Sequence, residues 1–551
     1  MAVRDDRGDV KQTTTGFRGP LMVQSLTSAK SKFLSLSEIV LIRPPMVLSK
    51  YSLSTSITPP LSIAYLASTL RKHGHDVQTI DALGEDVDRL TPVPNSVGLA
   101  QGMTIDDLVH RVHEEVKIIG YSSMFSCAWT YDKLIINRLR ERFPKALIVA
   151  GGEHITACPE YVLRDCSALD LCVRGEGEET LLEIVNAHLE GEDPTSLNGV
   201  VCQKDGFITM NPPRARIRNI DEIPPPYWDQ LPIEMYLDRG FGHGVNRGRS
   251  MPLLATRGCP FKCTFCSSPS MWTTRWEARS PQKVLNEIKE YISKYNAENF
   301  DLYDLTAIVK KKWIMEFCDL ILESGLDFTW QLPSGTRSEA IDDEVVEKLW
   351  QAGCRNMHYA PESGSPTVLK RIKKQVNLPR LESSARGAIR QGFNMKIHII
   401  FGFPKETFGE MWQTYKFGMK CAWIGIQDSS FIPYVPYPGS ELYKQLLSEK
   451  KIVPMSDEYF NGLIPFSDLQ HAKSYNPLLK DWHLLWARYL YFVLFYGTYY
   501  LRRPWRFFFM VSNLIRGKEE SRIETSLRHI IIRNTLLIKK RFFSNSRSFG
   551  E

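Results

Sequence analysis

Short apolar runs alternate with amphipathic stretches in the first part of the chain. The runs that are long enough for buried strands are 38–45, 77–81, 116–121, 146–152 and 169–173. Segments with helical periodicity lie between them, the first from Pro60 to His73. Strands that alternate with helices of this length indicate βαβ crossovers and a parallel sheet. We therefore expect a doubly wound α/β domain over residues 37–200, with its ligand site outside the carboxyl ends of the strands.

A second alternation begins near residue 252. The strands that it predicts are 252–256, 299–304, 327–332, 355–360, 394–401 and 427–433. The predicted helices are 281–295, 311–324, 342–352, 379–391 and 408–422. Six repeats of a βα unit give a second parallel sheet, and a barrel built from such units carries its active site on the loops after the strands. We expect this domain to span 248–445.

Three other segments have different patterns. Residues 1–36 are rich in Ser, Thr, Lys and Arg without a period, and we expect a disordered leader. Residues 201–247 combine a hairpin-like piece, a proline turn and a Gly-rich stretch, which indicates a connector. Residues 446–551 are helical, aromatic and basic.

The C-terminal region contains an uncharged run of thirteen residues, Tyr489 to Leu501, with arginines on both sides. A membrane-spanning helix needs about twenty apolar residues, so this run is too short to cross. It is expected to lie in a membrane interface or to cover a hydrophobic substrate. The alternative is a helix that packs across the barrel mouth with its arginines reaching water.

Composition narrows the class of protein. A chain of 551 residues predicts about three domains. Eleven cysteines without an apolar N-terminal signal indicate a reducing cytoplasm rather than a secreted disulfide scaffold. The formal charge is +7, and the segment from Arg502 to Glu551 holds twelve Lys and Arg against four Glu. The basic character therefore belongs to the C-terminal tail.

Three thiols lie within eight residues after the first strand of the second domain: Cys259, Cys263 and Cys266. An iron–sulfur cluster normally takes a full set of thiolates, so three of them leave one position for another ligand. Such an open position is where chemistry happens. The alternative is a structural zinc site, which needs four ligands that are usually arranged as separated pairs. The cysteines further along stand alone: Cys318, Cys354 and Cys421.

The spacing C-x3-C-x2-C, with Phe265 before the last cysteine, resembles the signature of the radical SAM superfamily. The resemblance implies a partial (β/α)6 TIM-type barrel, in which the cysteines hold a [4Fe-4S] cluster and its fourth iron binds S-adenosylmethionine (SAM). It also implies that Asp304 contacts the SAM amino group and that Arg337 contacts its carboxylate. The positions that match SAM-binding motifs are Phe265, Asp304, Arg337, Glu362, Ser363 and Gly402. For the Glu-Ser pair the alternative is a helix cap.

A flavodoxin- or Rossmann-like sheet before such a barrel resembles the cobalamin-binding radical SAM proteins. The resemblance places the corrinoid at Pro45, Ser122, Ser123, Gly151, Gly152, Glu153, His154, Gly175 and Glu176. The Asp-x-His-x-x-Gly box, which supplies a histidine to cobalt in many cobalamin proteins, is absent from the sequence. We therefore expect cobalamin without a histidine lower ligand, with His154 as the candidate if there is one. A degenerate module that binds nothing is the alternative.

The resemblance implies an enzyme that generates a 5′-deoxyadenosyl radical at the cluster. The function that it favours is methylation of an unactivated centre in a small or hydrophobic metabolite, as in class B radical SAM methyltransferases. Oxidative cyclisation or rearrangement is an alternative, because the chain is also similar to the anaerobic magnesium-protoporphyrin IX monomethyl ester cyclases. A non-catalytic cobalamin or iron–sulfur sensor is another.

The expected partners follow from the same resemblance. They are a small-molecule substrate of lipid-like or tetrapyrrole type and an electron donor such as flavodoxin or ferredoxin. The C-terminal region is expected to make peripheral membrane contact, so the protein would be cytoplasmic or membrane-associated. No nucleic acid is expected, because the additional N-terminal cysteine set of tRNA-modifying relatives is absent from the sequence.

Overall fold

The computed structural model describes residues 37–52, 57–521, 523–524, 527–528 and 531. The predicted leader over 1–36 and the last part of the predicted C-terminal region lie outside the described residues. Both sheets described below belong to one compact unit.

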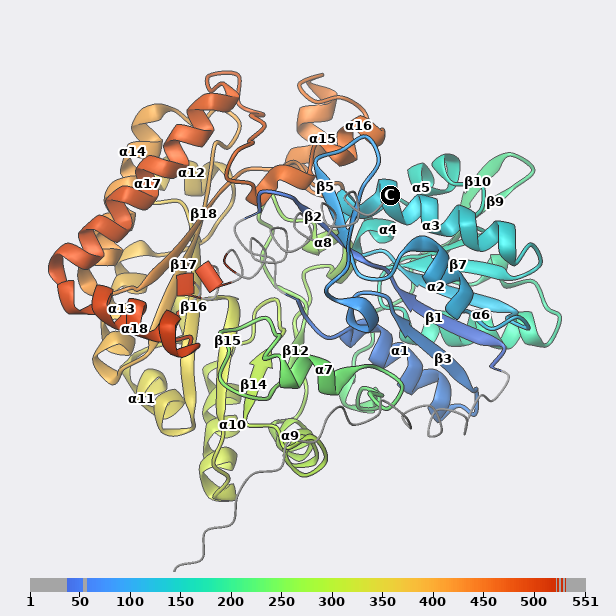
Figure 1. Cartoon of the computed structure of the whole chain (residues 1–551), viewed down its shortest axis with the longest axis horizontal. Coiled ribbons are helices and arrows are strands. Elements are labelled where there is room, and N and C mark those ends of the chain that lie inside the picture. Colours follow the sequence, from blue (N-terminus) through green and yellow to red (C-terminus); the bar gives the residue numbers. More distant parts are fainter. Residues whose placement is uncertain (1–36, 53–56, 522, 525–526, 529–530, 532–551) are drawn as a thin grey trace, which may run out of the picture. The chain divides into compact units, whose positions relative to one another are not determined.

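The N-terminal sheet has seven strands in the order β10-β9-β8-β7-β6-β1-β3 (Figure 1). Its parallel strands are β1 (Ile39–Arg43), β3 (Val77–Asp81), β6 (Ile118–Ser122), β7 (Leu147–Gly151) and β8 (Leu171–Val173). Its longer helices are α1 (Leu61–Lys72), α3 (Trp129–Arg142), α5 (Pro159–Asp165) and α6 (Glu178–Leu189). Strand order reverses at β1, so the crevice where such sheets bind ligands lies between β1 and β6. The predicted doubly wound sheet is confirmed.

A hairpin extends this sheet past the predicted boundary at residue 200. Strand β9 (Val200–Lys204) pairs antiparallel with both β8 and β10 (Phe207–Met210). The piece assigned to the connector is therefore part of the first sheet. A small antiparallel sheet was not predicted, and it consists of β2 (Met46–Ser49), β5 (Gly98–Gln101) and β4 (Leu90–Pro92).

The second sheet has six parallel strands whose order in space is their order in sequence. They are β11 (Ser250–Leu253), β14 (Asn299–Leu302), β15 (Thr329–Thr336), β16 (Cys354–Glu362), β17 (Asn394–Phe401) and β18 (Asp428–Pro433). The connecting helices are α9 (Pro281–Tyr295), α10 (Lys311–Ser324), α11 (Asp343–Gln351), α13 (Leu378–Gln391) and α14 (Phe408–Ile424). This arrangement confirms the predicted run of βα units.

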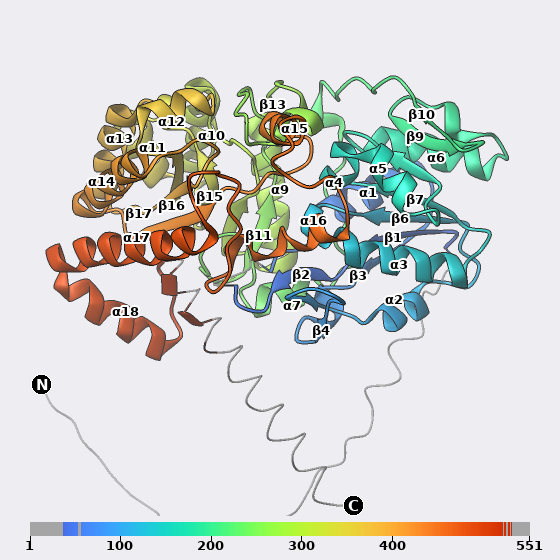
Figure 2. The same ribbon diagram turned by 90° about the horizontal axis from the view of Figure 1, so that it is seen from above.

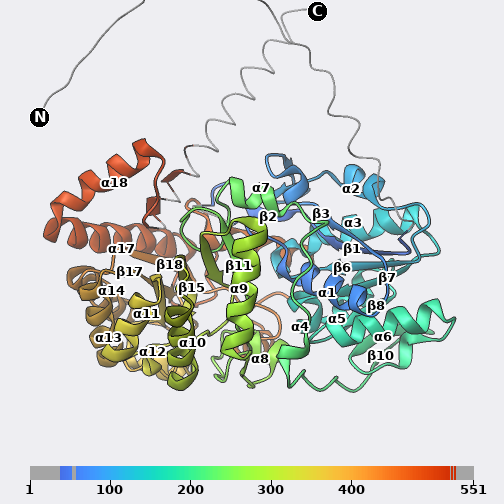
Figure 3. The same cartoon turned by 90° about the horizontal axis from the view of Figure 1, so that it is seen from below.

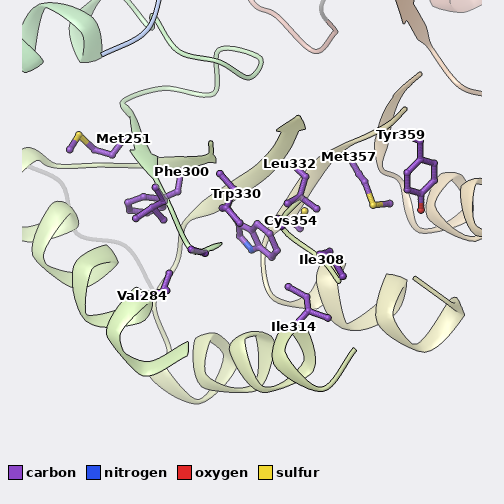
Figure 4. Close-up of a cluster of buried hydrophobic side chains, with 14 of the residues drawn as sticks. Met251, Val284, Phe300, Ile308, Ile314, Trp330, Leu332, Cys354, Met357 and Tyr359 are labelled. Atoms are coloured by element: carbon purple, nitrogen blue, oxygen red, sulfur yellow. The ribbon is translucent and has the colours of Figure 1, made fainter. Parts of the chain in front are cut away.

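The core of the second domain lies between the sheet and these helices. Phe300 on β14 and Trp330 on β15 are buried, and they face Ile314 from α10 (Figure 4). The Trp330 ring nitrogen donates to the Ala352 carbonyl at 2.7 Å, so this buried indole has its hydrogen bond. Along β17 buried and partly buried side chains alternate, so buried residues such as Ile397 lie on one face of the sheet and polar residues such as Lys396 and His398 lie on the other.

The C-terminal region is helical, as predicted. Its helices are α15 (Glu441–Ser448), α16 (Asp457–Asn461), α17 (Asp481–Arg502) and α18 (Pro504–Arg516). Helix α17 packs against α14 and β18, and α18 turns back from its end (Figures 2 and 3). Tyr491 of α17 stacks on Phe431 of β18 with a centroid separation of 4.0 Å. Among the described helices, none has the length and apolar character that a membrane span requires.

Candidate active site

The three predicted cluster ligands lie on one loop after β12 (Thr256–Arg257). Cys259, Cys263 and Cys266 are free thiols with partial exposure. The backbone N–H of Cys266 donates to the Cys263 carbonyl at 3.2 Å, and the Thr306 hydroxyl donates to the Cys259 sulfur at 3.5 Å. Burial raises the pKa of the Cys266 thiol to about 12, and a bound metal centre would offset the cost of deprotonating it.

The backbone of this loop is held in place at both ends. Gly258 has φ of +86°, and a Cβ there would lie 2.1 Å from the Arg275 carbonyl oxygen, so glycine is required. Further along, the Thr264 N–H donates to the Ile372 carbonyl at 3.0 Å, and the Thr264 carbonyl accepts from the Leu442 N–H at 2.8 Å. The loop is therefore built into the fold.

The zinc alternative requires several ligands around one ion. In the part of the chain that the structure describes, no group of three or more His, Cys, Asp or Glu side chains could hold a single metal ion. The thiols of a [4Fe-4S] cluster each bind a different iron, so a cluster does not need such a group. Three thiols on one loop match the number of protein ligands expected for a cluster with one open position.

Asp304 lies just after β14, beside the start of the cluster loop. Its Oδ2 accepts from the Ala255 N–H at 3.2 Å, while Oδ1 is buried without a hydrogen-bond partner. Burial raises the pKa of Asp304 to about 6. A buried acceptor without a donor is costly, and a cationic amino group would satisfy it. The position therefore suits the predicted contact with the SAM amino group.

Arg337 follows β15 and reaches the cluster loop. Its guanidinium lies 3.8 Å from the ring centroid of Phe261, which stands between the first two cysteines. Glu339 accepts two hydrogen bonds from it, at 3.1 and 3.2 Å, but Nη1 is buried without a partner. The neighbouring Thr336 hydroxyl is also buried without a partner. The Nη1 group of Arg337 thus remains available to donate to an anionic group.

Glu362 and Ser363, at the end of β16, have different surroundings. Glu362 adopts a left-handed backbone conformation with φ of +66°, which is unfavourable for a residue with a side chain, and its carboxylate pairs with Lys374 at 3.1 Å. The Ser363 hydroxyl lies 3.0 Å from the Thr414 hydroxyl and accepts from the Ser365 N–H at 3.1 Å. Ser363 is therefore engaged in local structure, but it does not cap the following helix α12 (Pro366–Arg371), whose N-cap residue is Ser365.

Gly402 begins a tight loop after β17. A Cβ at this position would lie 2.8 Å from a Leu484 methyl group, and φ is +76°. The Gly402 N–H donates to the Glu406 carboxylate at 2.6 Å, and burial raises the pKa of Glu406 to about 7. Phe265 of the cluster loop lies 5.7 Å from Phe403 between ring centroids. The structure thus brings Phe265 and the Gly402 loop together.

These residues fit a cluster and SAM. Soft thiol donors are gathered on one loop, and buried polar atoms without partners surround it on the two neighbouring strands. Sequence reasoning did not identify Phe261, Thr306, Lys374 or Glu406 as members of this group. Two of them gave a signal in the sequence: Phe261 stands between two cysteines, and Glu406 ends the Gly-x-Pro-x-Glu run that begins at Gly402.

The predicted cobalamin residues follow the carboxyl ends of β1, β6, β7 and β8. Gly152 has φ of +114°, and a Cβ there would lie 2.4 Å from the Ser123 carbonyl oxygen. The Gly175 N–H donates to the Thr156 hydroxyl at 3.1 Å. Pro45, Ser122 and Gly151 end neighbouring strands at the same edge. Gly152 thus allows the loops after β6 and β7 to approach closely, while a Cβ on Gly151 would meet only Val173, at 3.8 Å, so this part of the edge stays open for a ligand.

Two apolar side chains at this edge were missed by sequence reasoning. Met124 and Phe125 directly follow β6 at the switch point, and they are 41% and 64% exposed. Large exposed apolar groups are unusual where a ligand crevice is expected, unless a ligand covers them. Together with the glycine cradle, they fit a corrinoid.

Two other predicted cobalamin residues are occupied by internal contacts. The Ser123 hydroxyl donates to Asp132 at 2.6 Å. His154 is buried with its Nδ1 2.9 Å from the Ser126 hydroxyl, and its ring packs 5.1 Å from Trp129 between centroids. Burial lowers the pKa of His154 to about 3, so it stays neutral. The structure gives His154 the surroundings of a core histidine; the absence of a histidine lower ligand stays a prediction.

Glu153 and Glu176 connect the edge of the N-terminal sheet to the cluster loop. The Ser267 hydroxyl, one residue after the last cysteine, donates to the Glu153 carboxylate. The Glu176 carboxylate accepts from Arg257 at 3.1 Å and from Arg216 at 3.2 Å. Both glutamates therefore make contacts between the two domains, whereas the sequence analysis expected them to contact cobalamin.

A fourth charged residue completes the set. Glu178 accepts from Arg257 Nη2 at 2.6 Å, and the side chains of Arg216, Glu176, Arg257 and Glu178 are 8%, 5%, 5% and 9% exposed. We call these four residues the ion network. Arg257 stands two positions before Cys259, so the network ties the N-terminal sheet to the start of the cluster loop.

Comparison with known proteins agrees with this description. The family model for the Radical SAM superfamily matches residues 253–418, and the model for the B12 binding domain matches residues 53–185. An uncharacterized methyltransferase from Pyrococcus horikoshii is 29% identical over 80% of this chain and 90% of its own length. The anaerobic magnesium-protoporphyrin IX monomethyl ester cyclase of Rubrivivax gelatinosus is 26% identical over 74% of this chain and 69% of its own.

A solved structure shares the fold. The radical SAM methyltransferase TsrM from Kitasatospora setae, with cobalamin and a [4Fe-4S] cluster bound, superposes with a TM-score of 0.59 at 17% identity, covering 76% of this chain and 79% of that one. The two family matches support a [4Fe-4S] cluster, SAM and cobalamin as cofactors. The chain therefore belongs to the B12-binding radical SAM proteins, which are related to the class B methyltransferases and the anaerobic magnesium-protoporphyrin cyclases.

Proposed function

We propose that this radical SAM enzyme methylates an unactivated centre of a small or hydrophobic metabolite. The observation that carries the proposal is the ion network, in which Arg257 of the cluster loop pairs with Glu176 and Glu178 of the cobalamin-binding domain. The edge that would hold the methyl carrier is thereby fixed against the loop that would hold the cluster. A methyl group can reach a substrate only if both cofactors face the same space.

When bound, the cluster supplies an electron for the cleavage of SAM, and cobalamin supplies a carrier for a methyl group. The chain itself binds and orients. Cys259, Cys263 and Cys266 would hold the cluster. Asp304 would accept from the SAM amino group, and Arg337 would donate to its carboxylate.

A substrate would lie against the polar side chains that point into the second domain. The Ser334 hydroxyl lies 3.4 Å from His243 Nε2, and the His243 ring lies 5.5 Å from Tyr303 between centroids. His398 on β17 has its Nδ1 2.8 Å from the Ser430 hydroxyl. These residues are only partly buried, so they can orient a bound molecule through hydrogen bonds.

Oxidative cyclisation is the second candidate function, because the Rubrivivax relative named above is a cyclase. Quantifying the products formed from SAM separates the candidates without knowledge of the substrate. Methyl transfer from SAM leaves S-adenosylhomocysteine, whereas reductive cleavage gives methionine and, after one hydrogen atom is gained, 5′-deoxyadenosine.

The experiment incubates anaerobically reconstituted protein with SAM, hydroxocobalamin and titanium(III) citrate, and quantifies both products by mass spectrometry. A methyltransferase should form S-adenosylhomocysteine in an amount at least equal to bound corrinoid, and 5′-deoxyadenosine as well. A cyclase should form 5′-deoxyadenosine alone, and a sensor neither product. The last two outcomes would overturn the proposal. The Cys259, Cys263 and Cys266 triple alanine variant is the control, and it should lose 5′-deoxyadenosine.

A further inference from the structure

Helix α17 is apolar on both of its faces. Its inner face is buried through Leu484, Ala487, Tyr491, Phe495 and Tyr499, and the charged side chain of Arg488 is buried among them. The exposed positions between its ends carry no charge and are Trp482, Trp486, Tyr489, Leu490, Val493, Gly497 and Leu501. A surface helix of a globular protein normally places charged and polar residues on its outer face. The outer face of α17 therefore has the composition of a surface that something else covers.

Helix α18 adds to this surface. None of its residues is buried, although it contains Trp505 and three consecutive phenylalanines. Phe508 is 72% exposed and Ile515 is 81% exposed. Its contact with α17 runs through Tyr500, whose ring lies 5.7 Å from Phe507 between centroids. We call the exposed residues of α17 and α18 the aromatic face.

Most of the charged residues around the aromatic face are basic. From Trp482 to Arg516 the sequence contains no acidic residue. Arg502 and Arg516 are exposed, and so is Lys518 just beyond α18. The Arg502 guanidinium lies 4.3 Å over the ring of Trp423, an exposed side chain of α14. Two exposed acidic residues also lie at this border: Asp481 begins α17, and Glu520 pairs with Arg506 at 3.7 Å. The border of the apolar surface therefore carries an excess of cations.

We propose that the aromatic face binds the surface of an anionic lipid bilayer, with α17 and α18 lying in the interface. Trp and Tyr side chains favour the level of the lipid headgroups, and basic residues at the border attract anionic lipids. A second copy of this chain would also cover the apolar side chains. A twofold contact would, however, bring together two surfaces with the same excess of basic residues, whereas anionic lipid neutralises that charge.

The same helix contacts the second domain at the carboxyl edge of its sheet. A Cβ on Gly402 would lie 2.8 Å from Leu484, and Tyr491 stacks on Phe431 at 4.0 Å. A bilayer under α17 would therefore lie near the edge that carries the SAM candidates. Resting on the proposed function, this favours a hydrophobic substrate that enters from the bilayer.

The test uses the full chain and two sets of vesicles, phosphatidylcholine alone and phosphatidylcholine mixed with phosphatidylglycerol. Flotation should recover the protein with the mixed vesicles, and added salt should weaken the binding. The variant Val493→Glu/Phe508→Glu/Ile515→Glu should lose about tenfold or more in binding. Phe207→Glu, at a 78% exposed position of β10, is the matched control and should bind like the wild type.

Two results would overturn the proposal. One is that the triple glutamate variant binds the mixed vesicles as strongly as the wild type does. The other is a wild-type dimer, seen by light scattering, that the triple variant abolishes while neither protein binds vesicles. Binding is measured without SAM turnover, so its failure is distinguishable from failure of the proposed methylation. The variant should keep the wild-type yield of 5′-deoxyadenosine in the absence of vesicles, which shows that it is folded.

Discussion

Replacing Arg257 with methionine tests the ion network that joins the two sheets. Methionine keeps an unbranched stem but removes the charge. Glu178 would then be left without a cation, while Glu176 keeps Arg216 at 3.2 Å. Breaking a buried ion pair by removing one partner costs about 3–5 kcal/mol, because the remaining charge is buried and uncompensated. We expect the free energy of unfolding to fall by about that amount near neutral pH.

The loss of stability in Arg257→Met should depend on pH. Burial raises the pKa of Glu178, but Arg257 outweighs burial and holds the pKa below its ordinary value. In the wild type this contribution is present above the unfolded pKa of about 4.3 and is lost as pH falls through the folded pKa. Without Arg257 burial dominates, the folded pKa is raised, and protonation relieves the variant as pH falls. The difference between the two proteins should therefore shrink between about pH 7 and about pH 4.

The assay is urea unfolding followed by tryptophan fluorescence, together with the iron content after reconstitution. Arg257→Met should bind less iron, because its position adjoins the cluster loop. Arg257→Met/Glu178→Gln should recover part of the lost stability, since it removes the uncompensated charge. Arg239→Met is the control: its pair with Asp88 is 42% and 58% exposed and should contribute at most about 1 kcal/mol. Two results together would refute the reasoning: Arg257→Met lowers the free energy of unfolding no more than the control does, and the double variant recovers none of that loss.

Three further substitutions test single residues. Gly258→Ala should lower the iron bound after reconstitution, because the new Cβ would lie 2.1 Å from the Arg275 carbonyl oxygen. Gly325→Ala is the control: Gly325 also has a positive φ, +65°, but open space around it, so this variant should bind as much iron as the wild type. Burial raises the pKa of Asp132 to about 7, so the stability that protonated Asp132 contributes is complete below about pH 4 and is lost as pH rises through 7. Asp132→Asn should therefore flatten the plot of thermal midpoint against pH over this range. An unchanged plot would contradict this assignment. Arg337→Lys keeps the charge but loses the planar fork; SAM affinity in calorimetry should fall about tenfold or more, and wild-type affinity would exclude Arg337 as a contact.

The sequence predicted both sheets because short runs of strand length alternate with amphipathic segments of helical period. Strand β1 and helices α9 and α10 stand where the pattern placed them. The cluster loop was recognisable because its three cysteines are close in sequence. Local patterns were sufficient wherever the relevant residues are neighbours in the chain.

Contacts between distant residues were not predictable in this way. The pairing of Glu176 with Arg257 spans 81 positions, and nothing local distinguishes these carboxylates from ligand contacts. The Ser123 hydroxyl is taken by Asp132, which is only nine positions away but lies on the next helix. The expected hairpin joins the first sheet by pairing with β8, which no local pattern specifies. In each case the outcome depends on which side chain the tertiary fold brings near, and periodicity carries no information about that.

The central claim is that one chain holds a cluster on its three cysteines and a corrinoid on the edge of its N-terminal sheet. Metal analysis after anaerobic reconstitution with iron, sulfide and hydroxocobalamin tests it directly. We predict about four irons and about one cobalt per wild-type chain, and loss of the iron with retention of the cobalt in the Cys259, Cys263 and Cys266 triple alanine variant. Zinc in place of iron, iron retained by that variant, or a wild type that binds no cobalt would contradict the claim.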